Sequence, residues 1–294
     1  EEAKERVLKL PFIADVDTIP FPDRVLARMS HQLDITQELD GKRIGSLFGS
    51  RACPAKCTFC SSRIVWGRSP RNRSPKNIMD EVERLVDTFK IERYRFADDI
   101  FCFSSQTGVS KARDMAEEVQ KRGLEWLPWE CNLRGNISET DLEWLARAGC
   151  KLVNIGVETG AELIVKNIKK GVLLDSVRRS FRKAREMGME RRSYIILGTP
   201  GETVETLQQT WQFVEELDPD RISFTVAAPY PGSDLYDPAT MKAERFDLID
   251  EYGGAKSLCS LTTDELKYWQ REFSRRWKER LTPHAVQRAD ELER

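Results

Sequence analysis

Three cysteines stand within eight residues, Cys53, Cys57 and Cys60, in the segment SRACPAKCTFCSS. Such spacing is typical of metal ligands, and seven cysteines in 294 residues are too few for a disulfide scaffold. A structural zinc site normally has four protein ligands. Neither His31 nor His284 has a spacing that would supply the fourth. The loop therefore favours an iron–sulfur cluster, with zinc as the alternative.

The elements around this loop alternate between two patterns. Six short runs rich in aromatic and β-branched residues predict strands: RIGSLF, RYRFA, WLPWECN, KLVNIGV, RSYIIL and RISFTVA. Amphipathic helix patterns lie between them, the clearest at 75–89 with Ser74 as its N-cap. Alternating strands and helices predict an α/β fold with parallel strands and right-handed crossovers. Six units rather than eight predict a partial barrel, with ligands bound at the carboxyl ends of its strands.

The ends of the chain lack this alternation. Residues 11–23, PFIADVDTIPFPD, hold three prolines that predict an extended connector and exclude a helix. A last helix, begun by a capping box of Thr262 and Glu265, is expected to pack against the sheet. Its apolar face carries Leu266, Trp269, Phe273 and Trp277. We predict three parts: an N-terminal linker or extension at 1–42, a core at 43–236 and a C-terminal helical extension at 237–294.

The charge balance narrows the class of partner. The sequence has 47 Lys and Arg against 48 Asp and Glu, a formal net charge of −1. No overall field attracts nucleic acid or an anionic membrane, so we expect neither as a partner. The sequence begins without a signal-peptide pattern, and no apolar run approaches the ~20 residues of a membrane span. Unpaired cysteines suit a reducing cytoplasm, and the expected partners are small molecules or proteins.

The loop Cys-x-x-x-Cys-x-aromatic-Cys resembles the signature of the radical SAM superfamily. The resemblance implies that the three cysteines bind three irons of a 4Fe-4S cluster, and that S-adenosylmethionine (SAM) binds the fourth iron. One electron, from a donor such as flavodoxin or ferredoxin, would then break a carbon–sulfur bond and release a 5′-deoxyadenosyl radical. It also implies a partial (β/α)6 TIM-type barrel of the radical SAM kind, here with a C-terminal helical extension, and places Phe59 near the adenine.

Two later segments resemble the branch of this superfamily that is associated with cobalamin-binding domains. YRFADDIF at 94–101 is similar to its second-strand segment, which implies that Asp98 and Asp99 approach the amino group of SAM. WECNLRGN at 129–136 is similar to its third-strand segment, where Arg134 would hold a carboxylate. Taken alone, an Asp pair in a turn or one Arg at a strand end is ordinarily a solvated group.

Two further segments carry the resemblance along the chain. IGVETG resembles the fourth-strand motif, which implies that Glu158 bonds the ribose hydroxyls of SAM. Lys170, with Lys169 as the fallback, stands where related enzymes keep a basic residue for the SAM carboxylate. ILGTPGET resembles the fifth-strand turn, where Gly198 and Gly201 would let the backbone approach adenine.

The resemblance implies an enzyme that modifies a small-molecule substrate, without assigning a catalytic side chain. Members of the branch methylate unactivated carbons or build rings, often with cobalamin. This sequence contains no Asp-x-His-x-x-Gly cobalamin ligand motif, and too few residues precede 43 to form that domain. Two interpretations of the reaction stay open. One is cobalamin-dependent C-methylation, and the other is cobalamin-independent rearrangement, dehydrogenation or cyclisation. A non-catalytic iron–sulfur electron carrier is a more remote alternative.

Overall fold

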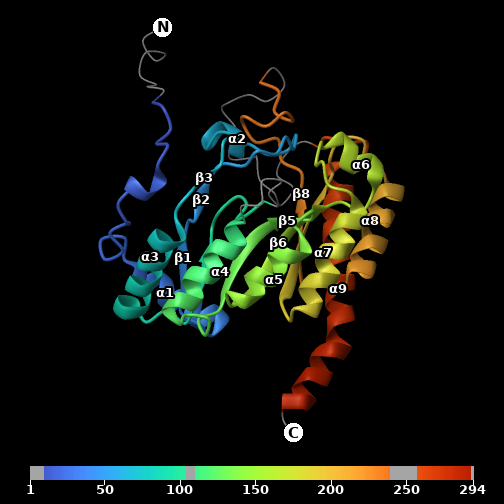
Figure 1. The fold of residues 1–294 in the computed structure, drawn as a ribbon. Coiled ribbons are helices and arrows are strands. Elements are labelled where there is room, and N and C mark those ends of the chain that lie inside the picture. The colour runs from blue at the N-terminus through green and yellow to red at the C-terminus, as the bar shows by residue number, and fades with distance from the viewer. Residues whose placement is uncertain (1–9, 104–109, 239–256, 293–294) are drawn as a thin grey trace.

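The computed structural model of the chain describes residues 10–103, 110–238 and 257–292, with side chains up to residue 280. Six parallel strands form one curled sheet in the order β1-β4-β5-β6-β7-β8 (Figure 1). They are β1 Ile44–Leu47, β4 Arg93–Phe96, β5 Trp129–Arg134, β6 Cys150–Glu158, β7 Glu190–Leu197 and β8 Arg221–Val226. Each strand pairs with the next one along the chain, which confirms the six predicted strands and the partial barrel.

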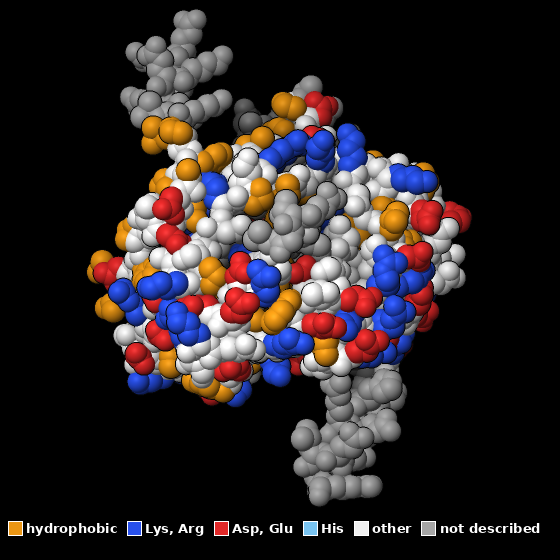
Figure 2. Space-filling model, viewed as in Figure 1, with side chains coloured by type: hydrophobic (Ala, Val, Ile, Leu, Met, Phe, Trp, Pro, Cys, Tyr) orange, Lys and Arg blue, Asp and Glu red, His pale blue; other side chains and the backbone are white. Residues whose placement is uncertain are grey.

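Five helices cover one face of this sheet, and each packs against the next in sequence. They are α3 Pro75–Phe89, α4 Lys111–Arg122, α5 Glu139–Arg147, α7 Leu174–Glu186 and α8 Val204–Leu217. The predicted cap Ser74 is confirmed, and Ser138 and Thr203 cap α5 and α8 in the same way: each of the three accepts a hydrogen bond from a backbone amide of the first turn. Figure 2 shows acidic and basic side chains interspersed over these helices.

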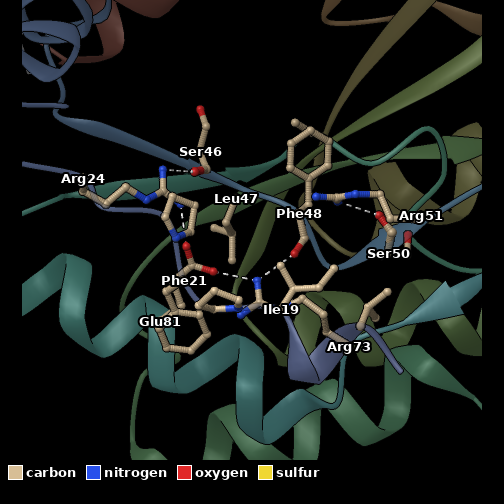
Figure 3. Close-up of a pocket in the computed structure, with 14 residues that line it drawn as sticks. Ile19, Phe21, Arg24, Ser46, Leu47, Phe48, Ser50, Arg51, Arg73 and Glu81 are labelled. Atoms are coloured by element: carbon tan, nitrogen blue, oxygen red, sulfur yellow. Dashed lines mark hydrogen bonds and ion pairs between the residues drawn. The ribbon is translucent and has the colours of Figure 1, made fainter. Parts of the chain in front are cut away.

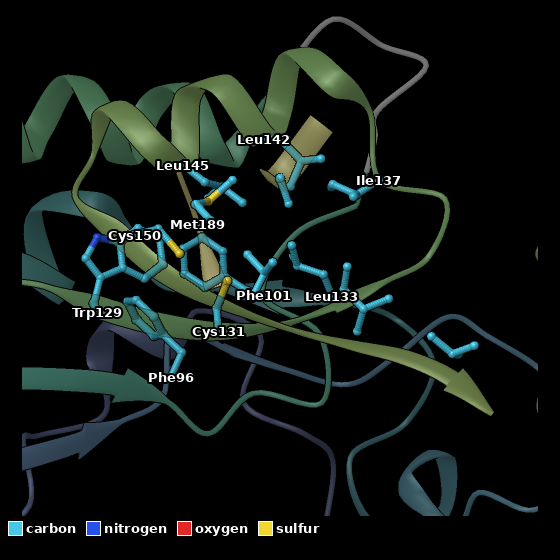
Figure 4. Close-up of a cluster of buried hydrophobic side chains, with 14 of the residues drawn as sticks. Phe96, Phe101, Trp129, Cys131, Leu133, Ile137, Leu142, Leu145, Cys150 and Met189 are labelled. Carbon is cyan, nitrogen blue, oxygen red and sulfur yellow. The ribbon is translucent and has the colours of Figure 1, made fainter. Parts of the chain in front are cut away.

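The hydrophobic core lies between the sheet and these helices. Aromatic rings from β4 and β5 pack closely there, with Phe96 and Trp129 at 5.3 Å between centroids (Figure 4). Cys102, Cys131 and Cys150 are buried in the same cluster, where each packs as a small apolar side chain. Burial raises the pKa of the Cys131 thiol well above its ordinary value, which keeps this cysteine uncharged.

The N-terminal part differs from its prediction. Residues 11–23 are not wholly extended, because Val16–Thr18 form one 3-10 turn capped by Asp15. Helix α1, Met29–Asp40, contacts β1 and buries Met29 and Leu33, although no helix is predicted before residue 43. The domain boundaries themselves stay predictions.

Short elements near the carboxyl ends of the strands were also not predicted. A two-residue ladder pairs β2, Ser50–Arg51, with β3, Arg71–Asn72, in the antiparallel direction. Helices α2, Ser62–Val65, and α6, Glu162–Asn167, are each shorter than two turns. Segments of this length have too few residues to show a hydrophobic period.

The last helix, α9 Thr263–Leu292, lies along β8 as predicted. Its capping box forms, since Thr262 N donates to Glu265 Oε2 at 2.7 Å and Glu265 N donates to Thr262 Oγ1 at 3.2 Å. Leu266, Phe273 and Trp277 are buried, and Trp269 is half-buried. Residues 239–256 of the predicted C-terminal extension lie outside the described residues. None of the described helices has the length and apolar character that a bilayer crossing requires.

Candidate functional site

The cysteine loop starts directly after β2, at the carboxyl end of the sheet. Cys57 is buried, and Cys53 and Cys60 are half-buried. Between Cys57 and Cys60, both backbone polar groups of Thr58 form hydrogen bonds. Its N–H donates to Ile168 O at 2.9 Å, and its carbonyl accepts from Asp234 N at 2.8 Å. The loop is thus fixed to segments that follow β6 and β8, far away in the sequence.

The segment after β8 also packs against α2. Arg63 forms an ion pair with Asp234. Gly232 has φ +86°, and a Cβ at this position would lie 2.8 Å from Ile64 Cγ1. A larger residue there would push the segment away from α2. These contacts join the segment after β8 to α2 and to the cysteine loop.

Glu158 and Lys170, predicted separately, form a buried ion pair with 2.5 Å between Oε1 and Nζ. Glu158 ends β6 with φ +69°, at the point where the register with β7 shifts. Gly156 provides the space for the pair, because a Cβ there would lie 2.5 Å from Glu158 Oε1 and 2.8 Å from Lys170 Nζ. An unusual backbone conformation and a glycine therefore hold this pair at the mouth of the half-barrel.

Arg134, at the end of β5, links this pair to the cysteine loop. One guanidinium nitrogen donates to Lys170 O, and another lies 3.6 Å from Cys57 Sγ. Burial raises the pKa of the Cys53 thiol, and the positive charge of Arg134 opposes that rise. The predicted residues Cys57, Arg134, Lys170 and Glu158 therefore form one connected group.

Phe59 belongs to the same region. Its ring packs against Ala161, Ile164 and Ile168, a small apolar cluster separate from the main core. The centre of the ring lies 5.9 Å from Lys170 Nζ. Phe59 therefore joins the cysteine loop to the segment that carries Lys170 through an apolar contact.

The predicted pair Asp98 and Asp99 is divided by the structure. Asp98 is buried and accepts from Gly49 N at 2.7 Å and from Ser50 Oγ at 2.8 Å. Burial raises its pKa, and Lys111 Nζ at 3.6 Å opposes the rise. Asp99 is exposed and accepts from Ser62 Oγ of α2. The side-chain bonds of Asp98 thus hold the residues before the cysteine loop and do not reach the group around Arg134.

At positions 198 and 201 the backbone conformation and the neighbouring side chains both require glycine. Their φ angles are +83° and +89°, in the region that favours glycine. A Cβ on Gly198 would lie 2.6 Å from Leu266 Cδ1, and one on Gly201 would collide with Asn167 Nδ2. The predicted approach of this turn to adenine stays a prediction.

A buried carboxyl group in the same turn was missed by the sequence analysis. Glu202 is fully buried and accepts from the backbone N–H groups of Gly198 and Thr199 through Oε2. Within the described part of the chain, its Oε1 has no hydrogen-bond partner. Burial raises the pKa of Glu202 from 4.5 to about 7. The only sequence signal is an acid in the turn GTPGE, four residues after Gly198.

This pKa predicts how folding stability depends on pH. Between pH 4.5 and about 7 the folded chain keeps a proton that the unfolded chain has lost, so stability falls as pH rises. At pH 8 the free energy of unfolding of Glu202→Gln should therefore exceed that of the parent chain by up to about 3 kcal/mol, and the variant should unfold at a higher temperature. This advantage should shrink at pH 5. Thermal unfolding of the cluster-free chain at both pH values measures the effect. Glu186→Gln, at an exposed position, is the control, and an advantage that is equal at both pH values would contradict the assignment.

The sequence analysis also missed residues that contribute to the site through main-chain hydrogen bonds or through the lack of a side chain. Thr58 and Asp234 meet through main-chain atoms, which leave no signature in residue type. Gly156 contributes only the absence of a side chain. Over the described residues, no three His, Cys, Asp or Glu side chains gather closely enough to hold a single metal ion.

Most of the chain is similar to proteins of one known family. The family model described as "Radical SAM superfamily" matches residues 47–214. An uncharacterized methyltransferase of Pyrococcus horikoshii is 30% identical over 248 residues, which cover 82% of this chain and 52% of that protein. Cytidylyl-2-hydroxyethylphosphonate methyltransferase of Streptomyces wedmorensis is 30% identical over 237 residues, covering 77% and 44%. The chain spans about half the length of these curated relatives.

A solved structure has the same fold. The radical S-adenosylmethionine methyltransferase TsrM from Kitasatospora setae, with cobalamin and a [4Fe-4S] cluster bound, superimposes with a TM-score of 0.59. The sequences are 21% identical, and the match covers 66% of this chain and 36% of that chain. At this identity the likeness concerns the fold alone.

Proposed function

The chain belongs to the radical SAM superfamily, whose cofactors are a 4Fe-4S cluster and SAM, and we propose that it cleaves SAM reductively to modify a small-molecule substrate. The observation that carries the proposal is the connected group at the mouth of the half-barrel. Cys57, Arg134, Lys170 and Glu158 were each predicted for the cluster or for SAM, and they contact one another in sequence-distant pairs.

The donor set fits this cluster better than a zinc ion. Zinc needs its ligands to converge on one point, and no such gathering exists among the described side chains. In a 4Fe-4S cluster each cysteine binds a different iron, so Cys53, Cys57 and Cys60 need not converge. Arg134 Nη1 lies 3.6 Å from Cys57 Sγ, so a cationic side chain stands beside one of the three sulfurs. We therefore assign these three cysteines as the cluster ligands.

The remaining residues are proposed to bind and orient SAM. When bound, the reduced cluster supplies the electron that breaks a carbon–sulfur bond of SAM. Glu158 would accept hydrogen bonds from the ribose hydroxyls, and Lys170 would attract the carboxylate. Their mutual ion pair keeps both charged groups in place at the mouth. Phe59, supported by Ile164 and Ile168, would provide an apolar face for adenine.

The finer reaction that we propose is methylation of carbon. It is supported by the names of the two relatives, which are methyltransferases. Cobalamin would be the methyl carrier, although these 294 residues contain no Asp-x-His-x-x-Gly motif. Radical rearrangement, dehydrogenation or cyclisation without cobalamin is the alternative. A flavodoxin or ferredoxin as electron donor and a cytoplasmic location belong to the same proposal.

Product analysis tests the proposal. The chain is reconstituted with iron and sulfide without oxygen and then incubated with SAM and dithionite. We expect 5′-deoxyadenosine and methionine, or S-adenosylhomocysteine where a methyl group is transferred, and none of them when dithionite is omitted. Absence of all three products would favour an electron carrier. Binding of cobalamin to the same preparation separates methyl transfer through cobalamin from the cobalamin-independent reactions.

A further inference from the structure

A cavity of about 280 Å³ lies between the N-terminal connector and the carboxyl end of β1 (Figure 3). The connector supplies an apolar wall that includes Ile19, Pro20 and Phe21. Leu47 and Ala97, at the ends of β1 and β4, form the opposite wall. None of the residues assigned to the cluster or to SAM lines it. The cavity therefore lies beside the site described above, with Arg51 two residues before Cys53.

The cavity is lined by more positive than negative charge. Three arginines line it, and Glu81 is its one carboxylate. Glu81 is buried and binds two of these arginines, Arg24 at 2.5 Å and Arg73 at 2.6 Å. The carboxylate of Glu81 is thus shared between two guanidinium groups, and it does not pair with the third arginine, Arg51.

Arg51 has no carboxylate at ion-pair distance within the described residues. Its guanidinium donates to Ser50 O at 3.1 Å and lies 3.9 Å from the centre of the Phe48 ring and 5.0 Å from that of Trp66. Arg24 also has a buried Nε without a hydrogen-bond partner in the described part of the chain. That Nε is enclosed by protein, so Arg51 is the guanidinium group whose donors an anion in the cavity would satisfy.

We propose that this cavity binds a small organic anion, a carboxylate or a phosphate joined to a compact apolar or aromatic body. The anionic group lies at Arg51, where a guanidinium can bind it bidentately. The apolar body lies between Phe21 and Leu47. A volume of about 280 Å³ is just below the usual range for ligand pockets, about 300–1,000 Å³, so the ligand is a metabolite smaller than a nucleotide cofactor.

Calorimetric titration of the reconstituted chain tests the proposal, with phenyl phosphate and benzoate as the two anionic probes. At least one of the two should bind, and the tighter one shows which anionic group the cavity prefers. Benzyl alcohol should bind at least tenfold more weakly because it lacks the charge. Arg51→Gln should weaken the tighter probe at least tenfold. Arg71→Gln, which removes the same charge from the residue paired with Arg51 across β2 and β3, should change its affinity less than twofold.

A second variant keeps the test decisive if Arg51→Gln fails to fold. Ala97 is exposed at the cavity wall, so Ala97→Phe should fold and block the probe without changing any charge. The proposal is overturned if neither anion binds the parent chain, if benzyl alcohol binds as tightly as the anions, or if Ala97→Phe and Arg51→Gln bind as the parent does. The titration needs no SAM turnover, so its outcome is independent of the proposed reaction.

Discussion

Cys57→Ala should give a chain that folds but retains less than about a tenth of the iron of the parent after reconstitution. Cys57 is the buried member of the three cysteines and the one whose sulfur lies next to Arg134. Its loss leaves one iron without a protein ligand, and an incomplete thiolate set does not hold a 4Fe-4S cluster. Iron and sulfide analysis with Mössbauer spectroscopy measures the effect, and SAM cleavage should fall to background.

A matched control comes from the buried core. Cys131→Ala removes another buried thiol, from β5, on the helix side of the sheet. It should lower stability by about 1 kcal/mol through the small cavity that it leaves, and it should keep the full iron content. A Cys57→Ala variant that keeps its iron and still cleaves SAM would remove the assignment of the loop as the cluster site.

The second large effect is expected at the ion pair of Glu158 and Lys170. Removing one partner from a buried pair leaves an uncompensated charge, so Glu158→Gln and Lys170→Met should each lose about 3–5 kcal/mol of folding stability. The double variant should recover much of this loss, because no buried charge remains. SAM affinity should fall at least tenfold in all three variants while the cluster is retained. Thermal unfolding and equilibrium binding of SAM provide the two measurements.

The double variant separates a structural role from a binding role. If the pair only stabilises the fold, the double variant recovers both stability and SAM affinity, and the assignment to SAM would be wrong. Lys183→Met is the control, because Lys183 and Glu143 also lie 2.5 Å apart but at the surface, away from the mouth. This half-buried pair at the surface should matter much less for stability than the buried pair, because solvent screens its charges, and its loss should leave SAM binding unchanged.

Much of the fold follows from the sequence, because long elements repeat their pattern over many residues. The helix at 75–89 has a clear apolar period, and the six strands are marked by aromatic and β-branched residues between turn signals. Helix α1 escaped prediction because only Met29 and Leu33 face the core. The turn at Val16–Thr18 depends on a side-chain cap from Asp15 inside a proline-rich segment. The short β2–β3 ladder is fixed by tertiary contacts rather than by its own residues.

The residues of the site were easier to predict than their contacts. The spacing of the cysteines and the motif around Glu158 identify residue types, since each motif is local. The bond between Glu158 and Lys170 depends on a positive φ at Glu158 and on the space at Gly156, which no local pattern reveals. Asp98 and Asp99 diverge because neighbouring side chains of an extended chain point to opposite sides.

The two backbone hydrogen bonds of Thr58, which anchor the cysteine loop, also limit when this loop can reach its final conformation during synthesis. Its partners, Ile168 and Asp234, leave the ribosome long after the cysteines themselves. At typical translation rates the second anchor arrives on the order of ten seconds later. Until then the cysteine loop lacks the hydrogen bond that Asp234 N donates to Thr58 O. Metal loading should therefore follow the emergence of residue 234, and a chain truncated before that residue should be a poor acceptor for an iron–sulfur scaffold protein.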